Sequence, residues 1–233
     1  MKAPQVIGPE RSLHNAKEAT WNPRGAHPMF TVEKITDAHG HVLLQDPPLA
    51  RFLFQSTSAA WLWLVVRLYV GFAFLEAGWH KFTDPAWMDG SGKSILGYWT
   101  RAVAVPDAPA RPLITYDWYR DFLQVLIGAN AAPWFSYVIV FGEIAVGVGL
   151  MVGTFVGIAA TSGLLMNLVF LLAGTTSTNP VLAGLGILLI LAWKNAGFVG
   201  LDRYLLPALG TPWRQARQAG FKAPTLQAAS VGP

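Results

Sequence analysis

The sequence predicts an all-α integral membrane protein: a four-helix transmembrane bundle with an amphipathic-helix cap in its first outer loop. Three observations support this fold class. Of the 233 residues, 53% are hydrophobic and only 13% are charged, a composition typical of membrane proteins. The apolar residues are gathered into long runs. Ten tryptophans recur near the ends of those runs, where an indole ring lies best between hydrocarbon and headgroups.

Four apolar segments account for four crossings of the bilayer. About 19 or 20 helical residues, rising 1.5 Å each, cover a hydrocarbon core of roughly 30 Å. A tight hairpin at Gly153 and Thr154 is expected between the second and third segments, because one continuous helix would be twice as long as the bilayer requires. The four segments are residues 61–79, 134–152, 154–173 and 181–199.

The crossings divide the chain into three parts: a polar N-terminal cytoplasmic arm (1–58), the bundle (59–200) and a basic cytoplasmic tail (201–233). An even number of crossings places both termini on one side. Basic flanks stay in the cytoplasm, so the basic tail places both termini there. The expected location is the cytoplasmic (inner) membrane of a prokaryote. The arm has no apolar run behind a basic start, so a cleaved signal peptide is not expected.

The loop between the first two crossings carries two candidate amphipathic helices. The stretch "YDWYRDFLQVLI", residues 116–127, places Trp118, Phe122 and Val125 on one side and most charged residues on the other, as an interfacial helix would. The stretch "KSILGYWTRAVAV" precedes it and is separated from it by prolines. Together they are expected to cap the outer mouth of the bundle.

Ionisable residues lie inside the apolar runs and need partners. Arg67 and Glu76 are nine residues apart and point in opposite directions on one helix. Arg67 shares its face with Gly71 and Gly78, which predicts a close contact with another helix. Glu143 lies at a similar depth in the second segment. We expect an Arg67–Glu143 ion pair as a structural lock, because an unpaired charge at that depth costs at least about 2.5 kcal/mol. A proton relay beside a quinone is the alternative.

Glu76 and His80 are the candidate catalytic residues. They lie four residues apart, on one helix face at the outer boundary, with Lys81 beside them. A carboxylate orients an imidazole and tunes its titration, so the pair suits proton exchange with a quinone headgroup. The alternative is that His80 and Lys81 anchor the helix in the headgroup layer while Glu76 bonds to the cap.

Small and amide residues in the later crossings predict helix packing. Asn167 lies on a stripe of small residues and is expected to bond to a neighbouring helix. Gly149, Gly153 and Gly157 recur at a spacing typical of close helix contacts.

Composition excludes several kinds of chemistry. The chain has no cysteine, which excludes disulfides and thiolate-held iron–sulfur clusters on this chain. His80 is the only histidine near a crossing, and no dinucleotide glycine motif is present. No haem, iron–sulfur cluster or flavin is therefore expected. The stretch "DAHGHV", with His39 and His41, is more typical of a solvated turn than of a metal site. The dispersed basic residues predict no nucleic-acid partner.

Several stretches together resemble one family. They are "RLYVGFAFLEAGWHKF", "DPAW", "GEIAVGVGLMVGTF", "LLMNLVFLLAGTTSTNP" and "GFVGLDRYLLP". They resemble the DoxX and DoxD group of small four-helix membrane proteins, over about residues 60–207. The long first loop is closer to DoxD, the small subunit of thiosulfate:quinone oxidoreductase; the polar arm is not part of the family pattern. The resemblance implies a subunit of a quinone-linked membrane oxidoreductase complex that passes electrons from thiosulfate to exchangeable membrane quinone.

If the resemblance extends to activity, the positions and chemistry of eight residues predict a pocket for substrate or quinone near the cap. Its cations would neutralise the thiosulfate dianion, and its tryptophans would form the walls. The selected residues are Lys81, Trp87, Trp99, Arg101, Arg111, Trp118, Arg120 and Trp134. Whether the chain is itself an enzyme stays open. The alternative is a non-catalytic accessory or structural subunit of a larger respiratory or photosynthetic membrane complex, held through the polar arm and the glycine-rich helix faces. A transporter is disfavoured because no inverted repeat is evident.

Overall fold

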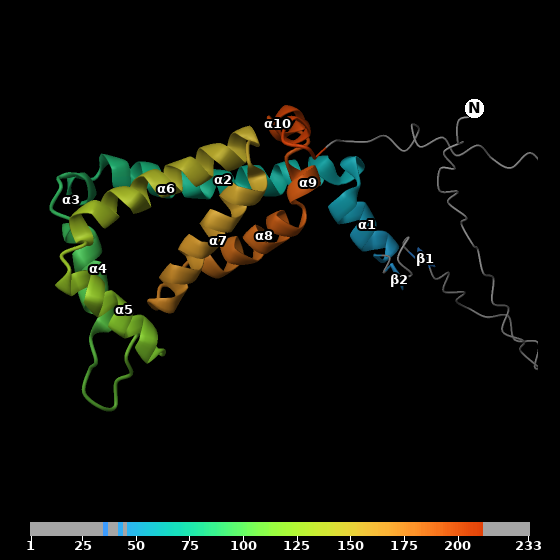
Figure 1. Cartoon of the computed structure of the whole chain (residues 1–233). Coiled ribbons are helices and arrows are strands. Elements are labelled where there is room, and N and C mark those ends of the chain that lie inside the picture. Colours follow the sequence, from blue (N-terminus) through green and yellow to red (C-terminus); the bar gives the residue numbers. More distant parts are fainter. Residues whose placement is uncertain (1–34, 37–41, 44–45, 212–233) are drawn as a thin grey trace, which may run out of the picture. The chain divides into compact units, whose positions relative to one another are not determined.

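The structure is a computed structural model that describes residues 35–36, 42–43 and 46–211 (Figure 1). Two short strands, β1 (Ile35–Thr36) and β2 (Val42–Leu43), pair antiparallel within a first compact unit that ends at Gln45. The second unit begins at Asp46, and its secondary structure is helical throughout the described residues. The predicted all-α class is confirmed for this second unit, which starts earlier than the predicted bundle boundary at residue 59.

The helices of the second unit follow one another with short connections, except for the loop after α4. Helices are found at all four predicted apolar segments and at both predicted cap segments. They are α1 (Pro48–Gln55), η1 (Thr57–Ala59), α2 (Ala60–Thr83), α3 (Pro85–Met88), α4 (Lys93–Val103), α5 (Asp117–Gly128), α6 (Ala132–Val152), α7 (Val156–Leu172), α8 (Asn179–Leu191), α9 (Trp193–Ala196) and α10 (Asp202–Ala208).

Two helical stretches of the described chain, Thr57–Thr83 and Ala132–Val152, are long and apolar enough to cross a membrane; α7 and α8 are apolar but shorter. Less than half of either long stretch is buried, at 39% and 44%. A core helix of a soluble protein would bury most of its apolar side chains, whereas Val65 and Val138 here are 66% and 55% exposed. Length and surface together favour a membrane protein.

The predicted fourth segment, 181–199, is not one continuous helix. Helix α8 ends at Leu191, and after Ala192 the short helix α9 begins at Trp193. The 13 residues of α8 extend only about 20 Å at 1.5 Å per residue. Helix length alone therefore does not establish four crossings.

The turn between α6 and α7 is the tight hairpin that the sequence predicts. Gly153 ends α6 with a φ of +74°, a left-handed conformation that favours glycine because it lacks a Cβ. The backbone N–H groups of Gly153 and Thr154 both donate to Gly149 O at 2.9 Å. Helix α7 begins at Val156, so the two helices are antiparallel neighbours.

Helices α2 and α6 pack closely because glycines line their contact. A Cβ built on Gly147 would lie 2.6 Å from the backbone nitrogen of Leu75, and one on Gly78 would lie 2.9 Å from that of Ile144. A Cβ built on Gly71 would lie 3.1 Å from both Gly147 O and Leu150 Cβ. The predicted close contact on the glycine face of the first crossing is therefore confirmed.

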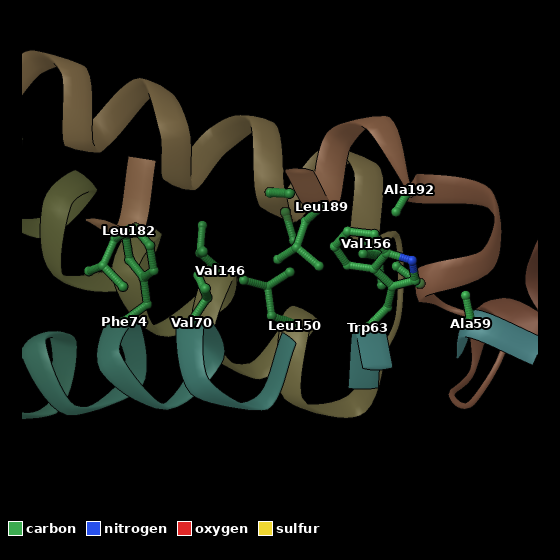
Figure 2. Close-up of a cluster of buried hydrophobic side chains, with 13 residues drawn as sticks. Ala59, Trp63, Val70, Phe74, Val146, Leu150, Val156, Leu182, Leu189 and Ala192 are labelled. Atoms are coloured by element: carbon green, nitrogen blue, oxygen red, sulfur yellow. The ribbon is translucent and has the colours of Figure 1, made fainter. Parts of the chain in front are cut away.

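One buried apolar cluster joins α2 and α6 to α7 and α8. Figure 2 shows Phe74 beside Leu182, and Leu150 and Leu189 between Val70 and Trp63 along the same row. Leu150 and Leu189 are fully buried. These side chains hold the four long helices as one packed body, since apolar burial and close packing act together.

The cap has its own core, and α5 buries a different face from the predicted one. Tyr119 and Leu123 face inward, whereas Trp118, Phe122 and Val125 are 61%, 47% and 67% exposed. The prediction of two cap helices is confirmed, but the row predicted as the apolar side lies on the outside. The reason is that α5 carries apolar residues on two faces, and the inner one packs on α4.

Tyrosine hydroxyls bind the cap to the end of α7. Tyr119 Oη donates to Val169 O at 2.8 Å, and Tyr98 Oη lies 2.9 Å from Thr175 Oγ1. Burial raises the pKa of Tyr119 from 10.0 to about 12, because the phenolate is disfavoured away from water.

The glycine contact can be tested by adding side chains. We expect Gly147→Val to lower the free energy of unfolding by about 3 kcal/mol, because the new side chain meets the backbone of Leu75. Gly184→Ala is the matched control, since nothing lies within 4 Å of its position on α8. Thermal unfolding in mild detergent should separate the two variants; an equal melting temperature for both would contradict the packing.

The cap should loosen in alkali. A raised pKa in the folded state means that the neutral phenol of Tyr119 contributes stability below pH 10.0, which is lost as the pH rises towards 12. We expect the melting temperature to fall across that interval, and Tyr119→Phe to remove part of the fall. The exposed Tyr116 provides the control, Tyr116→Phe, which should leave the pH profile unchanged.

Candidate functional site

A cavity lies where α2, α7 and α8 meet, with a volume of about 440 Å³. Its walls are mainly apolar, and its polar groups come from all three helices and from the turn before α8. The apolar lining consists of Phe72, Ala73, Phe74, Ala77, Phe170 and Leu182, and the polar lining of Tyr69, Glu76, His80, Asn167, Thr178 and Asn179. An apolar pocket with a few converging polar groups is typical of small-molecule sites.

Glu76 and His80 lie on the wall of this one cavity. Their positions follow from the helix, because residues four apart on α2 share a face. Within the described part of the chain, neither side chain forms a hydrogen bond or an ion pair, and both are exposed. A carboxylate and an imidazole are thus available to a ligand in the cavity.

Asn167 contributes the third polar group, from α7. The residue is 3% exposed, and its Nδ2 has no hydrogen-bond partner among the described residues. Its predicted bond to a neighbouring helix is therefore not found for the amide nitrogen. A Cβ built on Gly163, one turn before Asn167, would lie 3.0 Å from the ring of Phe74, so α7 lies close to this side chain of α2, and Asn167 lines the cavity. A buried donor without a partner costs free energy, and a ligand acceptor would satisfy it.

The rest of the polar lining was not predicted from the sequence. It consists of Tyr69, Thr178 and Asn179. Asn179 Nδ2 donates to Thr175 O at 3.0 Å, which holds that side chain at the start of α8. The stretch "TSTNP" indicates a turn, and nothing in that pattern shows that the turn faces Glu76.

Lys81, not Arg67, pairs with Glu143. Lys81 Nζ lies 2.8 Å from Glu143 Oε1 and 2.6 Å from Oε2. Glu143 is 3% exposed, and the ring of Trp87 lies 5.5 Å from the Lys81 ammonium. The lysine is therefore turned to α6, and the expected meeting of its ammonium with Glu76 and His80 is wrong.

The predicted Arg67–Glu143 ion pair is wrong because of the register between α2 and α6. Glu143 packs beside Gly78, whereas the guanidinium of Arg67 lies against Gly153, at the other end of α6. From Arg67 to Gly78 the helix rises about 16 Å. Lys81 shares the face of Arg67 and is the cation that reaches the carboxylate.

Arg67 is instead bonded to backbone carbonyls. Its Nη1 donates to Ala196 O at 3.1 Å and its Nη2 to Val199 O at 2.7 Å. The side chain is 1% exposed, and the carboxylate of Asp202 is close enough to attract it electrostatically. Asp202 also accepts from the N–H groups of Phe155 and Val156, at 2.6 and 2.9 Å.

The structure does not bring the predicted cap-side pocket together. Trp99 is 3% exposed and packs edge-on against Phe135 at 5.1 Å, so it belongs to the core of the cap. Trp118 and Trp134 are 61% and 55% exposed. None of these tryptophans lines the α2–α7–α8 cavity.

The cap cations have their own contacts. Arg120 pairs with Asp117 at 2.5 Å and donates to Ile114 O at 2.7 Å. Arg101 lies over the ring of Tyr98 at 5.9 Å, and Arg111 is exposed on the loop. They are not gathered around one anion site.

The glycine series packs inside the chain, as predicted. Gly149 faces Ala159, Gly157 faces Trp193, and Gly153 faces the guanidinium of Arg67. These faces are thus occupied by the chain's own residues. The histidine stretch with His39 and His41 lies outside the described residues.

A double-mutant cycle tests the Lys81–Glu143 pair. We expect Lys81→Met to lower the free energy of unfolding by about 3 kcal/mol, because it leaves the buried carboxylate of Glu143 unpaired. Glu143→Gln should lower it by less, because the Lys81 side chain is 21% exposed. The double variant should recover part of that loss. Asp117→Asn, which breaks a pair whose carboxylate is 84% exposed, is the control and should cost less than about 1 kcal/mol.

Charge reversal distinguishes Lys81, the observed partner of Glu143, from Arg67, the predicted one. Lys81→Glu combined with Glu143→Lys should melt above either single variant. Recovery by Arg67→Glu with Glu143→Arg instead would contradict the observed pairing.

Comparison of the chain with family models, curated proteins and solved structures gives no match. The resemblance to the DoxX and DoxD group therefore stays a prediction from the sequence. The function of the cavity is inferred from its residues and their geometry.

Proposed function

We propose that the chain crosses the membrane four times and binds membrane quinone in the α2–α7–α8 cavity, as a subunit of a quinone-linked oxidoreductase complex. The observation that carries the proposal is the buried, unpartnered Nδ2 of Asn167 in a cavity that also holds Glu76 and His80. The predicted resemblance to DoxD supports the same class of ligand.

The four crossings are supported by the packing of the shorter helices. Helix α7, with 17 residues, extends about 26 Å and pairs with the longer α6 through the hairpin. Exposed apolar side chains continue onto both short helices, including Ile158, Leu165 and Ile187 at 67%, 58% and 49%. Such surfaces suit acyl chains and would be costly in water.

The cavity residues fit a quinone. A quinone is a flat apolar ring with two carbonyl oxygens, each a hydrogen-bond acceptor. Phe72, Phe74 and Phe170 supply aromatic walls, while Asn167 Nδ2 can donate to one carbonyl. His80 can donate to the other when its facing nitrogen carries a proton.

Bound quinone would supply an acceptor of two electrons and two protons, which becomes quinol. Glu76 and His80 can hold and pass those protons, since a carboxylate and an imidazole can each accept and release a proton. The electrons come from a donor outside this cavity, which the resemblance suggests is thiosulfate acting through a partner subunit.

The quinone site is tested by binding of decylubiquinone to the purified full chain in detergent. We expect Asn167→Leu to weaken binding about tenfold, because one hydrogen bond is lost and a polar oxygen is left unpaired. Gln124→Leu, which makes the same change at an exposed position on α5, should bind as the unaltered chain does. Equal affinity in these two variants would falsify the proposed site.

Proton exchange is tested separately, with thiosulfate and with the partner complex present. His80→Gln and Glu76→Gln should lower the rate of quinone reduction while leaving decylubiquinone bound, because a glutamine amide can still donate a hydrogen bond but cannot carry a proton. Binding without any turnover in the complex would contradict the oxidoreductase role and favour a non-catalytic accessory subunit.

A further inference from the structure

A second hollow lies at the opposite end of α7, away from Glu76 and His80. It has a volume of about 570 Å³. It is bounded by the first two turns of α7, the end of α8, the start of α9, and α10. Its lining includes Phe155, Ile158, Ile190, Trp193 and Leu206.

Two of the polar residues that line this hollow, Asp202 and Thr161, are already bonded within the chain. The carboxylate of Asp202 accepts from the N–H groups of Phe155 and Val156. The hydroxyl of Thr161 donates to Gly157 O at 2.7 Å. Because these two groups need no ligand and most of the other lining residues are apolar, the hollow suits an apolar occupant such as an acyl chain.

The shortness of α8 explains why the hollow exists. Helix α8 stops at Leu191, and the chain turns through α9 to α10 instead of continuing along α7. Ile158 is 67% exposed on the wall that is left uncovered. In a bilayer this space would be filled, since a void beside acyl chains loses dispersion contacts.

Basic residues mark the rim. Lys194 is exposed, and its Nζ lies 5.6 Å from the ring of Trp193, which lines the hollow. Arg203 follows Asp202 on α10 and is also exposed. A tryptophan with a neighbouring lysine and an arginine at a membrane boundary favours an anionic headgroup.

We infer that the hollow between α7, α9 and α10 binds one phospholipid with an anionic headgroup, its acyl chain against Ile158 and its phosphate beside Lys194. The inference rests on the membrane location in the proposed function, but not on the quinone site. The lipid site lies at the other end of α7, so loss of either site leaves the other measurable.

Native mass spectrometry of the full chain tests this lipid site. The chain is equilibrated with equal amounts of phosphatidylglycerol and phosphatidylcholine that carry the same acyl chains. We expect one retained phosphatidylglycerol per chain. Ile158→Trp should displace both lipids because it fills the hollow, whereas Val138→Trp, at a similarly exposed position on α6, should not.

The headgroup is tested by neutralising the rim. Lys194→Gln should lower the preference for phosphatidylglycerol over phosphatidylcholine about fivefold, and Lys93→Gln, on α4, should leave it unchanged. Ile158→Phe provides a smaller filling change if the tryptophan variant fails to fold. Equal retention of the two lipids by the unaltered chain would overturn the inference. So would a gain in retained lipid on deletion of 212–233, because the tail would then be the occupant.

Discussion

The buried guanidinium of Arg67 is the constraint on which the packing of the bundle depends. A charged group that is 1% exposed must have its hydrogen bonds supplied by the protein, or its burial would be prohibitively costly. The carbonyl of Ala196, at the end of α9, and that of Val199, in the turn that follows, accept from the two terminal nitrogens, whereas Nε has no partner among the described residues. Because α2 holds the arginine and the carbonyls lie at the end of α9 and just after it, α2 and the last apolar segment meet at one point.

The same point fixes the α6–α7 hairpin. A side chain at Gly153 would overlap the guanidinium, and one at Gly200 would lie 2.9 Å from the Gly153 backbone, so both glycines are needed for the close approach. Asp202 caps the first N–H groups of α7 and balances the charge of Arg67. At the other end of α2, the Lys81–Glu143 pair holds the helix to α6. With that face of α2 packed, the Glu76 and His80 face is left to form the cavity with α7 and α8.

The sequence predicts the helices well because apolar runs, turns and prolines are local signals. It does not predict the partner of Glu143, because Arg67 and Lys81 share a face and only the glycine contacts set the register. The break at Ala192 carries no glycine or proline to mark it. The inner face of α5 could not be chosen by periodicity, since Tyr119 and Trp118 both lie in apolar rows. The role of Asn167 depends on where three helices leave a cavity, which no single segment encodes.

Four crossings would place the proposed quinone cavity and the proposed lipid site in opposite halves of the bilayer. The chain has no cysteine, so single cysteines can be introduced and labelled in sealed vesicles with a thiol reagent that does not cross membranes. The account predicts that cysteines at Ser91 and Ser177 react from one side, and those at Thr57 and Gly210 from the other. Labelling of Ser177 from the same side as Thr57 would contradict it.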